Sequence, residues 1–189
     1  MPANRKVAII VGSLRKESWT RKVAKVVVSL APPTLVFEFV EIGDLPHYNQ
    51  DLEANPPTEW VRFREAVRTF DAVLFATPEY NRSVPGVLKN AIDVGSRPPD
   101  KKVWDGKPAA VLSVSTGALA AFGANHHLRQ ALVYMNMPTM AQPEAYVGGV
   151  AKVFDESGNL TNEGTLKFLQ KFVDAFAAWV GRLSGPAGS

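Results

Sequence analysis

The chain has 189 residues, of which 46% are hydrophobic and 21% charged, and this composition is that of one ordinary globular domain. It contains no cysteine, so disulfides, thiolate nucleophiles and cysteine-based zinc or iron–sulfur sites are excluded. Its 21 Lys and Arg against 18 Asp and Glu give a formal net charge of +3, a mild excess that suits a protein meeting small anionic molecules.

No long basic run is present, so we expect no nucleic-acid partner. No apolar run reaches the roughly 18 residues that span a membrane, and residues 1–6 lack the pattern of a signal peptide. We therefore expect a cytoplasmic protein without a membrane partner. The three histidines are too few for a His-rich metal site, and the adjacent pair His126 and His127 would face different sides of a helix.

Five segments have the composition of strands. Residues 7–11, 71–76 and 108–114 are almost continuously apolar, which is typical of strands buried on both faces of a parallel sheet. Residues 35–40 form another apolar run, and a short fifth strand is expected near Thr139.

Helical spacing of apolar residues lies between these strands. Helices are expected over about 18–30, 60–70, 85–92, 124–135 and 162–183, with Pro85 opening the third and Thr161 capping the last, whose apolar stripe runs from Leu166 to Leu183. Strands and helices alternate along the chain, which predicts a single doubly wound α/β domain over residues 1–189, with 184–189 as a disordered tail. Ligands of such folds bind beyond the carboxyl ends of the strands.

The segment after the first strand is chemically suited to one phosphate group. It lacks the Gly-Lys-Ser/Thr of a P-loop and the glycines of a dinucleotide-binding loop. It supplies three hydroxyls, from Ser13, Ser18 and Thr20, and the guanidinium of Arg15, at a helix start whose N–H groups and dipole favour an anion. From the residues alone, a capped helix start with an exposed arginine is an equal alternative.

Two further loops follow neighbouring strands. Pro78 and Pro85 brace the first, Tyr80 offers a flat face, and its backbone N–H groups suit a heteroaromatic edge; the alternative is an ordinary loop in which Ser83 caps the next helix. Residues 115–123 are mostly small and include two glycines, which lets a backbone approach a planar ligand closely, although a flexible linker would have the same composition.

Three motifs are more specific: Gly-Ser-Leu-Arg-Lys-Glu-Ser at 12–18, Pro-Glu-Tyr-Asn at 78–81, and Ser-Val-Pro-Gly-Val-Leu-Lys-Asn-Ala-Ile-Asp at 83–93. With Gly-Lys-Pro at 106–108 and His-Leu-Arg-Gln at 127–130, they resemble the NADPH-dependent FMN reductase family, in its branch of bacterial quinone and chromate reductases. The similarity runs from about Lys6 to Gly149, and more loosely through the last helix.

The resemblance implies a flavodoxin-like fold, a five-stranded parallel sheet of order 2-1-3-4-5 with helices on both faces, and bound FMN. It implies that the FMN phosphate and ribityl chain are held by Ser13, Arg15, Ser18, Trp19 and Thr20. It also implies that the isoalloxazine ring is lined by Pro78, Glu79, Tyr80 and Asn81 and closed at its far edge by Ser115, Thr116 and Gly117.

The sequence departs from the family pattern at two places. Glu17 puts a carboxylate beside the expected phosphate, and we expect its side chain to point to solvent. Ala120-Ala121 stands where relatives often have Gly-Gly, which leaves the path of that loop open.

The implied function is an FMN-dependent NAD(P)H oxidoreductase that reduces quinones and other small acceptors, chromate among them, by hydride transfer through flavin N5 in a ping-pong cycle. NADH or NADPH is the donor, and no catalytic side chain is nominated because the flavin carries the chemistry. The alternatives are a flavodoxin-type electron carrier, which the basic charge disfavours, and a reductase that supplies reduced flavin or reduces azo compounds. A phospho-acceptor domain is excluded, because strands one and three end in Gly12-Ser13 and Thr77-Pro78 rather than in acidic residues.

The resemblance also implies a homodimer or homotetramer with an interface around Arg129 and Glu144. Trp104, Tyr134 and Tyr146 are candidate interface aromatics, although core packing is expected for at least one of them.

Three cations, Arg82, Arg97 and Lys101, are candidates for the rim of the site, where they would favour an anionic acceptor. Solvated surface residues are the alternative for each of them.

Overall fold

The computed structural model describes residues 4–184, and it contains one parallel sheet of five strands in the order β2-β1-β3-β4-β5. The strands are β1 (Arg5–Val11), β2 (Leu35–Phe39), β3 (Ala72–Thr77), β4 (Ala109–Val114) and β5 (Ala145–Val147). All four neighbouring pairs run parallel. This order confirms the flavodoxin-like fold expected from the sequence.

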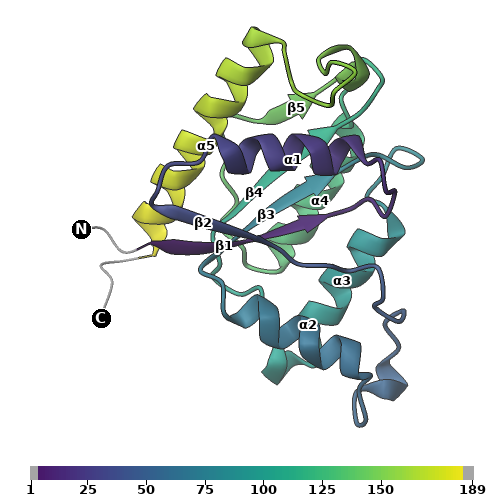
Figure 1. The fold of residues 1–189 in the computed structure, drawn as a ribbon. Coiled ribbons are helices and arrows are strands. Elements are labelled where there is room, and N and C mark those ends of the chain that lie inside the picture. The colour runs from purple at the N-terminus through teal and green to yellow at the C-terminus, as the bar shows by residue number, and fades with distance from the viewer. Residues whose placement is uncertain (1–3, 185–189) are drawn as a thin grey trace.

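Five helices cover the sheet on both faces: α1 (Trp19–Ser29), α2 (Thr58–Arg68), α3 (Gly86–Ser96), α4 (Phe122–Tyr134) and α5 (Glu163–Leu183). Short 3-10 turns lie at η1 (Gln50–Leu52), η2 (Pro99–Lys101) and η3 (Val150–Lys152). Helices α1 and α5 lie on one face, and α2, α3 and α4 lie on the other (Figure 1).

The central strands are apolar because both of their faces are covered. In β1, Val7 and Ile9 belong to the core under α1 and α5, whereas Ala8 and Ile10 belong to the core under α2, α3 and α4. Every residue of β3 and β4 is buried. The continuous apolar runs of the sequence are therefore explained by two cores that share one sheet.

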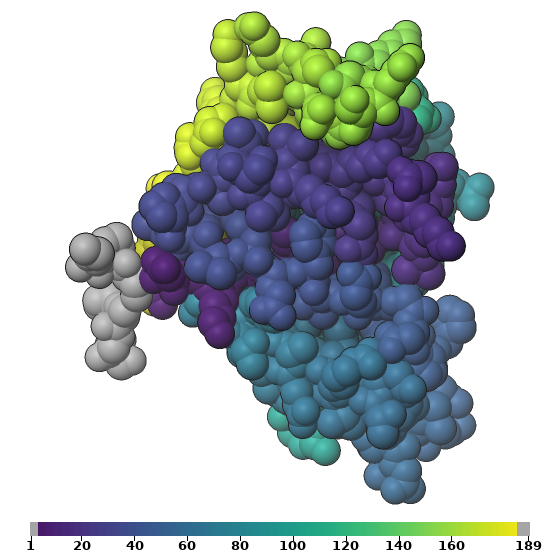
Figure 2. Space-filling model, in the orientation of Figure 1, coloured from purple at the N-terminus to yellow at the C-terminus, as the bar shows by residue number. Residues whose placement is uncertain are grey.

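The N-terminal and C-terminal parts of the chain pack together around α1. In the space-filling view, the yellow-green C-terminal segments lie against the purple N-terminal ones (Figure 2). The rings of Trp19, at the start of α1, and Phe154 are 5.4 Å apart between centroids. This contact fixes the end of α1 that faces the carboxyl edge of the sheet.

Several expected boundaries are wrong. The fifth strand is β5 at Ala145–Val147, whereas Thr139 makes only an isolated bridge to Ala109, and Pro138 before it lacks the N–H that would extend the ladder. The cap of α5 is Asn162, whose side chain accepts a bond from the N–H of Thr165 at 2.9 Å, and not Thr161.

Helix α3 is also longer than expected, since it continues to Ser96 rather than ending at Ile92, and Pro85 precedes its first residue. Most of the tail predicted over 184–189 lies outside the described residues.

Candidate functional site

A pocket lies at the carboxyl edge of the sheet, where β1, β3 and β4 end. It encloses about 520 Å³, part of it open to solvent. Its lining comprises Ser13, Arg15, Ser18, Trp19, Thr20, Pro78, Glu79, Tyr80, Val114, Ser115 and Thr116. Ten of the twelve predicted site residues are therefore brought together, all except Asn81 and Gly117.

The start of α1 forms one side of the pocket. Ser18 is its N-cap, and the Ser18 hydroxyl accepts a bond from the N–H of Arg21 at 3.2 Å. The first N–H groups of a helix have no partner within the helix, and they carry the positive end of its dipole. Because Trp19 and Thr20 both line the pocket, this helix end is directed toward it.

Three polar side chains of this wall lack partners within residues 4–184. Ser13 and Thr20 are only 5% and 2% exposed, yet their hydroxyls make no hydrogen bond there. Arg15 likewise forms no ion pair or hydrogen bond with those residues. A hydrogen-bond donor or acceptor that lies at a pocket wall and has no partner in the protein is available to a ligand. A guanidinium, two hydroxyls and a helix N-terminus together fit a phosphate monoester.

Two cations of α1, Arg21 and Lys22, are paired elsewhere, unlike Arg15. Arg21 binds both carboxylate oxygens of Glu41 at 2.8 and 2.7 Å. Lys22 pairs with Glu17 at 2.7 Å, and this contact lowers the pKa of the Glu17 carboxyl. The Glu17 side chain is 77% exposed and does not line the pocket, as expected from the sequence.

The loop after β3 ends in a tight hairpin turn. The N–H groups of Tyr80 and Ser83 donate to each other's carbonyls at 3.1 and 3.0 Å. Between them, Asn81 and Arg82 both have left-handed backbone, with φ of 52° and 64°. This is the twist that suits a two-residue hairpin, although glycine usually occupies the second position. The turn presents Tyr80, which is 45% exposed, at the pocket.

The loop after β4 has a second left-handed pair. Ala120 and Ala121 have φ of 52° and 60°, a region that glycine enters without steric cost. Ala120-Ala121 therefore adopts the backbone that the Gly-Gly expected from the family pattern would adopt without strain. Gly117 shapes the same loop from outside the pocket lining, since its N–H donates to the Ser115 hydroxyl and its carbonyl accepts from the N–H of Gly149.

The histidines of α4 contact different neighbours. Nδ1 of His127 lies 3.0 Å from the Ser83 hydroxyl, and Nε2 of His126 lies 3.1 Å from the Tyr146 hydroxyl. Burial and then the contact with Glu144 raise the pKa of Tyr146 to about 12. Within residues 4–184, no group of His, Asp and Glu side chains is placed to hold a metal ion.

The residues expected at an interface divide into three kinds. Trp104 is 1% exposed and packs its ring against Phe63 and Phe75, so it is a core residue. Arg129 donates to the side chain of Asn125 and to the carbonyl of Met140, which holds α4 against the chain before β5. Tyr134, by contrast, is 86% exposed at the end of α4.

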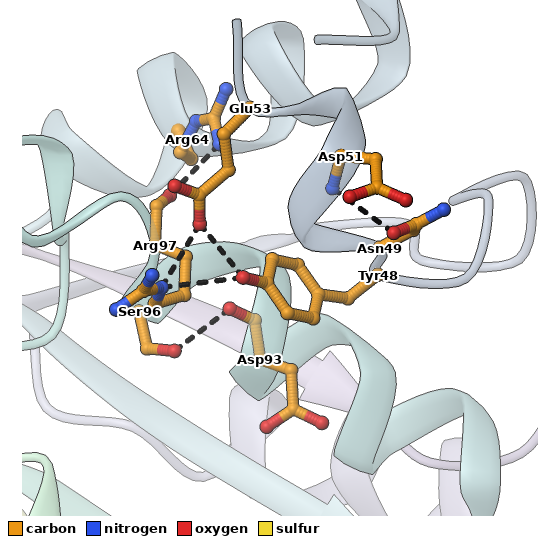
Figure 3. Close-up of polar contacts among 8 residues, drawn as sticks. All are labelled: Tyr48, Asn49, Asp51, Glu53, Arg64, Asp93, Ser96 and Arg97. Atoms are coloured by element: carbon orange, nitrogen blue, oxygen red, sulfur yellow. Dashed lines mark hydrogen bonds and ion pairs between the residues drawn. The ribbon is translucent and has the colours of Figure 1, made fainter.

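None of the three cations expected at the rim is among the residues that line the pocket, but Arg82 lies in the turn beside Tyr80, whereas Arg97 and Lys101 lie beyond the far end of α3. Nε of Arg97 binds Glu53 at 2.9 Å and the Tyr48 hydroxyl at 3.3 Å, and the Arg97 carbonyl accepts from Arg64 (Figure 3). The eleven residues of α3 separate Arg97 from the loop after β3 by roughly 16 Å at 1.5 Å per residue. The carbonyl of Lys101 accepts from Arg68 near the same end. The expectation for these two residues is wrong.

Two buried amide side chains that tie helices to neighbouring segments were not anticipated from the sequence. Asn90 of α3 is 7% exposed, accepts from the N–H of Tyr48 at 2.8 Å and donates to the carbonyls of Leu45 and Pro46. Asn125 of α4 is fully buried and donates to Ser113 of β4. An amide side chain at an apolar helix position was the available signal, because a buried amide must be hydrogen-bonded.

This fold and this pocket define a flavodoxin-like α/β protein whose first strand-to-helix turn presents a guanidinium, hydroxyls and a helix N-terminus to the pocket. The chain belongs to the family of NADPH-dependent FMN reductases, whose model matches residues 5–152. It is accordingly an oxidoreductase with FMN as cofactor and NAD(P)H as electron donor.

Individual relatives agree with this family. A quinone reductase of Pseudomonas putida is 63% identical over 175 residues, which cover 92% of this chain and 94% of the relative. A 2-hydroxy-1,4-benzoquinone reductase of a Burkholderia species is 45% identical over 175 residues, covering 93% and 96%. The solved structure of the flavoenzyme NAD(P)H:(acceptor) oxidoreductase of Paracoccus denitrificans superposes with a TM-score of 0.89 at 46% identity, covering 95% of this chain and 98% of that one.

Proposed function

We propose that the chain is an FMN-dependent NAD(P)H:quinone oxidoreductase whose cofactor phosphate is held at the start of α1. The observation that carries the assignment of the site is the set of polar groups at that helix end, Arg15, Ser13 and Thr20, that have no partner within residues 4–184. The quinone acceptor is supported by the Pseudomonas relative at 63% identity and the Burkholderia relative at 45% identity.

In this proposal each wall of the pocket has one task. Arg15, Ser13, Ser18 and Thr20 bind the phosphate, with Trp19 beside the ribityl chain. The ring is held by Pro78, Glu79, Tyr80 and Asn81 on one side and by Ser115, Thr116 and Gly117 on the other. The chemistry that FMN supplies when bound is acceptance of a hydride from NAD(P)H and its delivery to the acceptor.

The protein's own part is to orient the cofactor and to choose what reaches it. The positive charge of Arg15 and the dipole of α1 offset the phosphate charge, which fixes one end of the cofactor. The turn at residues 80–83 limits access on the side of β3. Arg82 lies at this turn with a 71% exposed side chain, and it is the rim cation that would favour an anionic acceptor, chromate among them.

We also propose a homodimer or homotetramer located in the cytoplasm. Large apolar side chains remain exposed on α4 and just before it, namely Leu119, Phe122, Val133 and Tyr134, at 59%, 52%, 74% and 86%. Apolar surface of this kind, gathered on one element, is typical of a contact with another chain. Light scattering at micromolar concentration tests this, and a monomer would contradict it.

The function is tested with purified protein and no added flavin. We expect a yellow protein that releases FMN on denaturation and oxidises NADH or NADPH with a quinone faster than free FMN does. Oxidation no faster than with free FMN would instead favour the electron carrier. A panel of quinones, chromate, an azo dye and free flavin then ranks the acceptors.

A further inference from the structure

Helix α4 begins without a side chain of its own to cap it. Its N-cap residue, Ala121, has left-handed backbone with φ 60° and ψ 37° and makes no side-chain cap bond. Helices usually begin at Ser, Thr, Asp or Asn, whose oxygen accepts from the N–H of the second or third helical residue. Ala121 offers only a methyl group, so this bond must be made by another part of the chain or by water.

The missing oxygen is supplied by Glu79, from the loop after β3. Oε2 of Glu79 accepts from the N–H of Ala124 at 3.1 Å, and Ala124 is the third residue of α4. The Glu79 side chain is only 12% exposed. A carboxylate at this position also meets the positive end of the α4 dipole, an interaction that stabilises the start of the helix.

The contact is close enough to require glycine at the second position of the helix. A Cβ on Gly123 would lie 2.8 Å from the carbonyl oxygen of Arg82 and 2.9 Å from Oε2 of Glu79. The Arg82 carbonyl belongs to the tight turn with two left-handed residues, so it cannot move away cheaply. The turn after β3 therefore rests directly on the first turn of α4.

Two more contacts strengthen this junction. The second oxygen of Glu79, Oε1, accepts from Arg82 at 3.3 Å, which ties the turn back onto the loop that carries it. One helical turn further along α4, His127 contacts the hydroxyl of Ser83, the last residue of the turn. The turn is thus attached to α4 at two successive levels.

The junction joins two loops that both line the pocket. Glu79 and Tyr80 come from the loop after β3, whereas Ser115 and Thr116 begin the loop that leads into α4. Since the start of α4 is the end of that second loop, a bond from Glu79 to Ala124 fixes the spacing of both.

We propose that Glu79 is a positioning residue, whose carboxylate replaces the N-cap of α4 and thereby holds the two ring-binding loops at the spacing that the cofactor requires. This inference rests on the proposed function, and it gives the Glu79 side chain a task beyond lining the ring. Without the bond from Glu79 to Ala124, the two loops have the spacing that binds FMN for only a fraction of the time. The apparent association constant for FMN is then reduced in proportion to that fraction.

The test compares variants of the full chain by the FMN dissociation constant of the apoprotein and by amide hydrogen exchange at Ala124. Glu79→Ala removes the cap, and we expect an increase of about tenfold in both the dissociation constant and the exchange rate, the equivalent of about 1.4 kcal/mol. Glu79→Gln keeps an acceptor oxygen but not the charge, so both values should rise by only about twofold to threefold.

Two glycine variants complete the set. Gly123→Ala disturbs the junction from the helix side and should weaken FMN binding as Glu79→Ala does, even if the latter fails to fold. Gly86→Ala is the matched control, because Gly86 likewise lies in the first turn of its helix but has open space around a Cβ, and we expect no change in affinity.

Unchanged exchange at Ala124 in Glu79→Ala would overturn the cap and with it the proposal. Faster exchange with unchanged FMN affinity would overturn the positioning role. A wild-type chain that binds no FMN would refute the proposed function as well, so the two failures are distinguishable.

Discussion

Two polar regions of the molecule use the same kinds of side chain and differ in whether those side chains have partners. In the network at residues 48–97, the Glu53 carboxylate lies between the Tyr48 hydroxyl and Arg97, and the buried Arg64 donates to the Arg97 carbonyl (Figure 3). In the pocket, Arg15 has no partner within residues 4–184. Partnered charges hold the chain together, whereas unpartnered ones at a pocket wall are available to a ligand.

The largest expected effect is at the pocket, where Arg15 has no partner within residues 4–184. Arg15→Ala should weaken FMN binding by about 1.5–3 kcal/mol, the value of a hydrogen bond to a charged group. The FMN dissociation constant of the apoprotein, measured by flavin fluorescence, checks this. The control is Lys16→Ala, an exposed neighbour outside the pocket lining, and equal effects of the two changes would refute the phosphate assignment.

A substitution in the network at residues 48–97 should lower the stability of the fold and leave FMN affinity unchanged. Asn90→Ala leaves the Tyr48 N–H and two carbonyls without their partner, which should cost about 2 kcal/mol and lower Tm by roughly 4–8 °C. Thermal unfolding of the apoprotein measures this, and FMN affinity should stay within about twofold. A large loss of affinity at unchanged Tm would show that this region belongs to the site.

A smaller effect is expected at the left-handed pair after β4. Ala121→Gly removes a steric cost of about 1–2 kcal/mol and adds some chain entropy to the unfolded state, so a net gain of roughly 0.5–1 kcal/mol is expected. The control Ala131→Gly lies within α4 and should instead lose about 1 kcal/mol. Denaturant unfolding of both variants gives the comparison, and a loss at both positions would contradict the left-handed backbone.

The smallest effect concerns acid pH. The bond from the Tyr48 hydroxyl, and then Arg97, hold the pKa of Glu53 below its ordinary value of 4.5. A lowered carboxyl pKa stabilises the folded state above the unfolded pKa, and this contribution is lost as pH falls through the lower folded value. The decrease of Tm as the pH falls below about 5 should therefore be smaller in Glu53→Gln than in the wild type, and Tyr48→Phe should show an intermediate decrease. Parallel Tm curves for wild type and Glu53→Gln would contradict this.

The sequence sufficed for the parts of the fold that follow from burial. Strands β1, β3 and β4 were predicted from continuous apolar runs, and these runs exist because both faces of each strand are covered. Parallel order then places their carboxyl ends at one edge, which is why ten of twelve predicted site residues line one pocket.

What the sequence did not predict depends on contacts between distant segments. The turn at Asn81 and Arg82 contains no glycine to signal it, and the cap of α4 comes from Glu79, 45 residues away from Ala124. Arg97 was misplaced at the rim because charge alone does not show which carboxylate, here Glu53, lies nearby.

The central claim is that the start of α1 binds the phosphate of FMN, and riboflavin tests it most directly because it lacks only that phosphate. Titration of the wild-type apoprotein with both flavins should give FMN the tighter binding by at least about hundredfold, since two or more charge-assisted hydrogen bonds are made to the phosphate. Equal affinity for FMN and riboflavin would contradict the account.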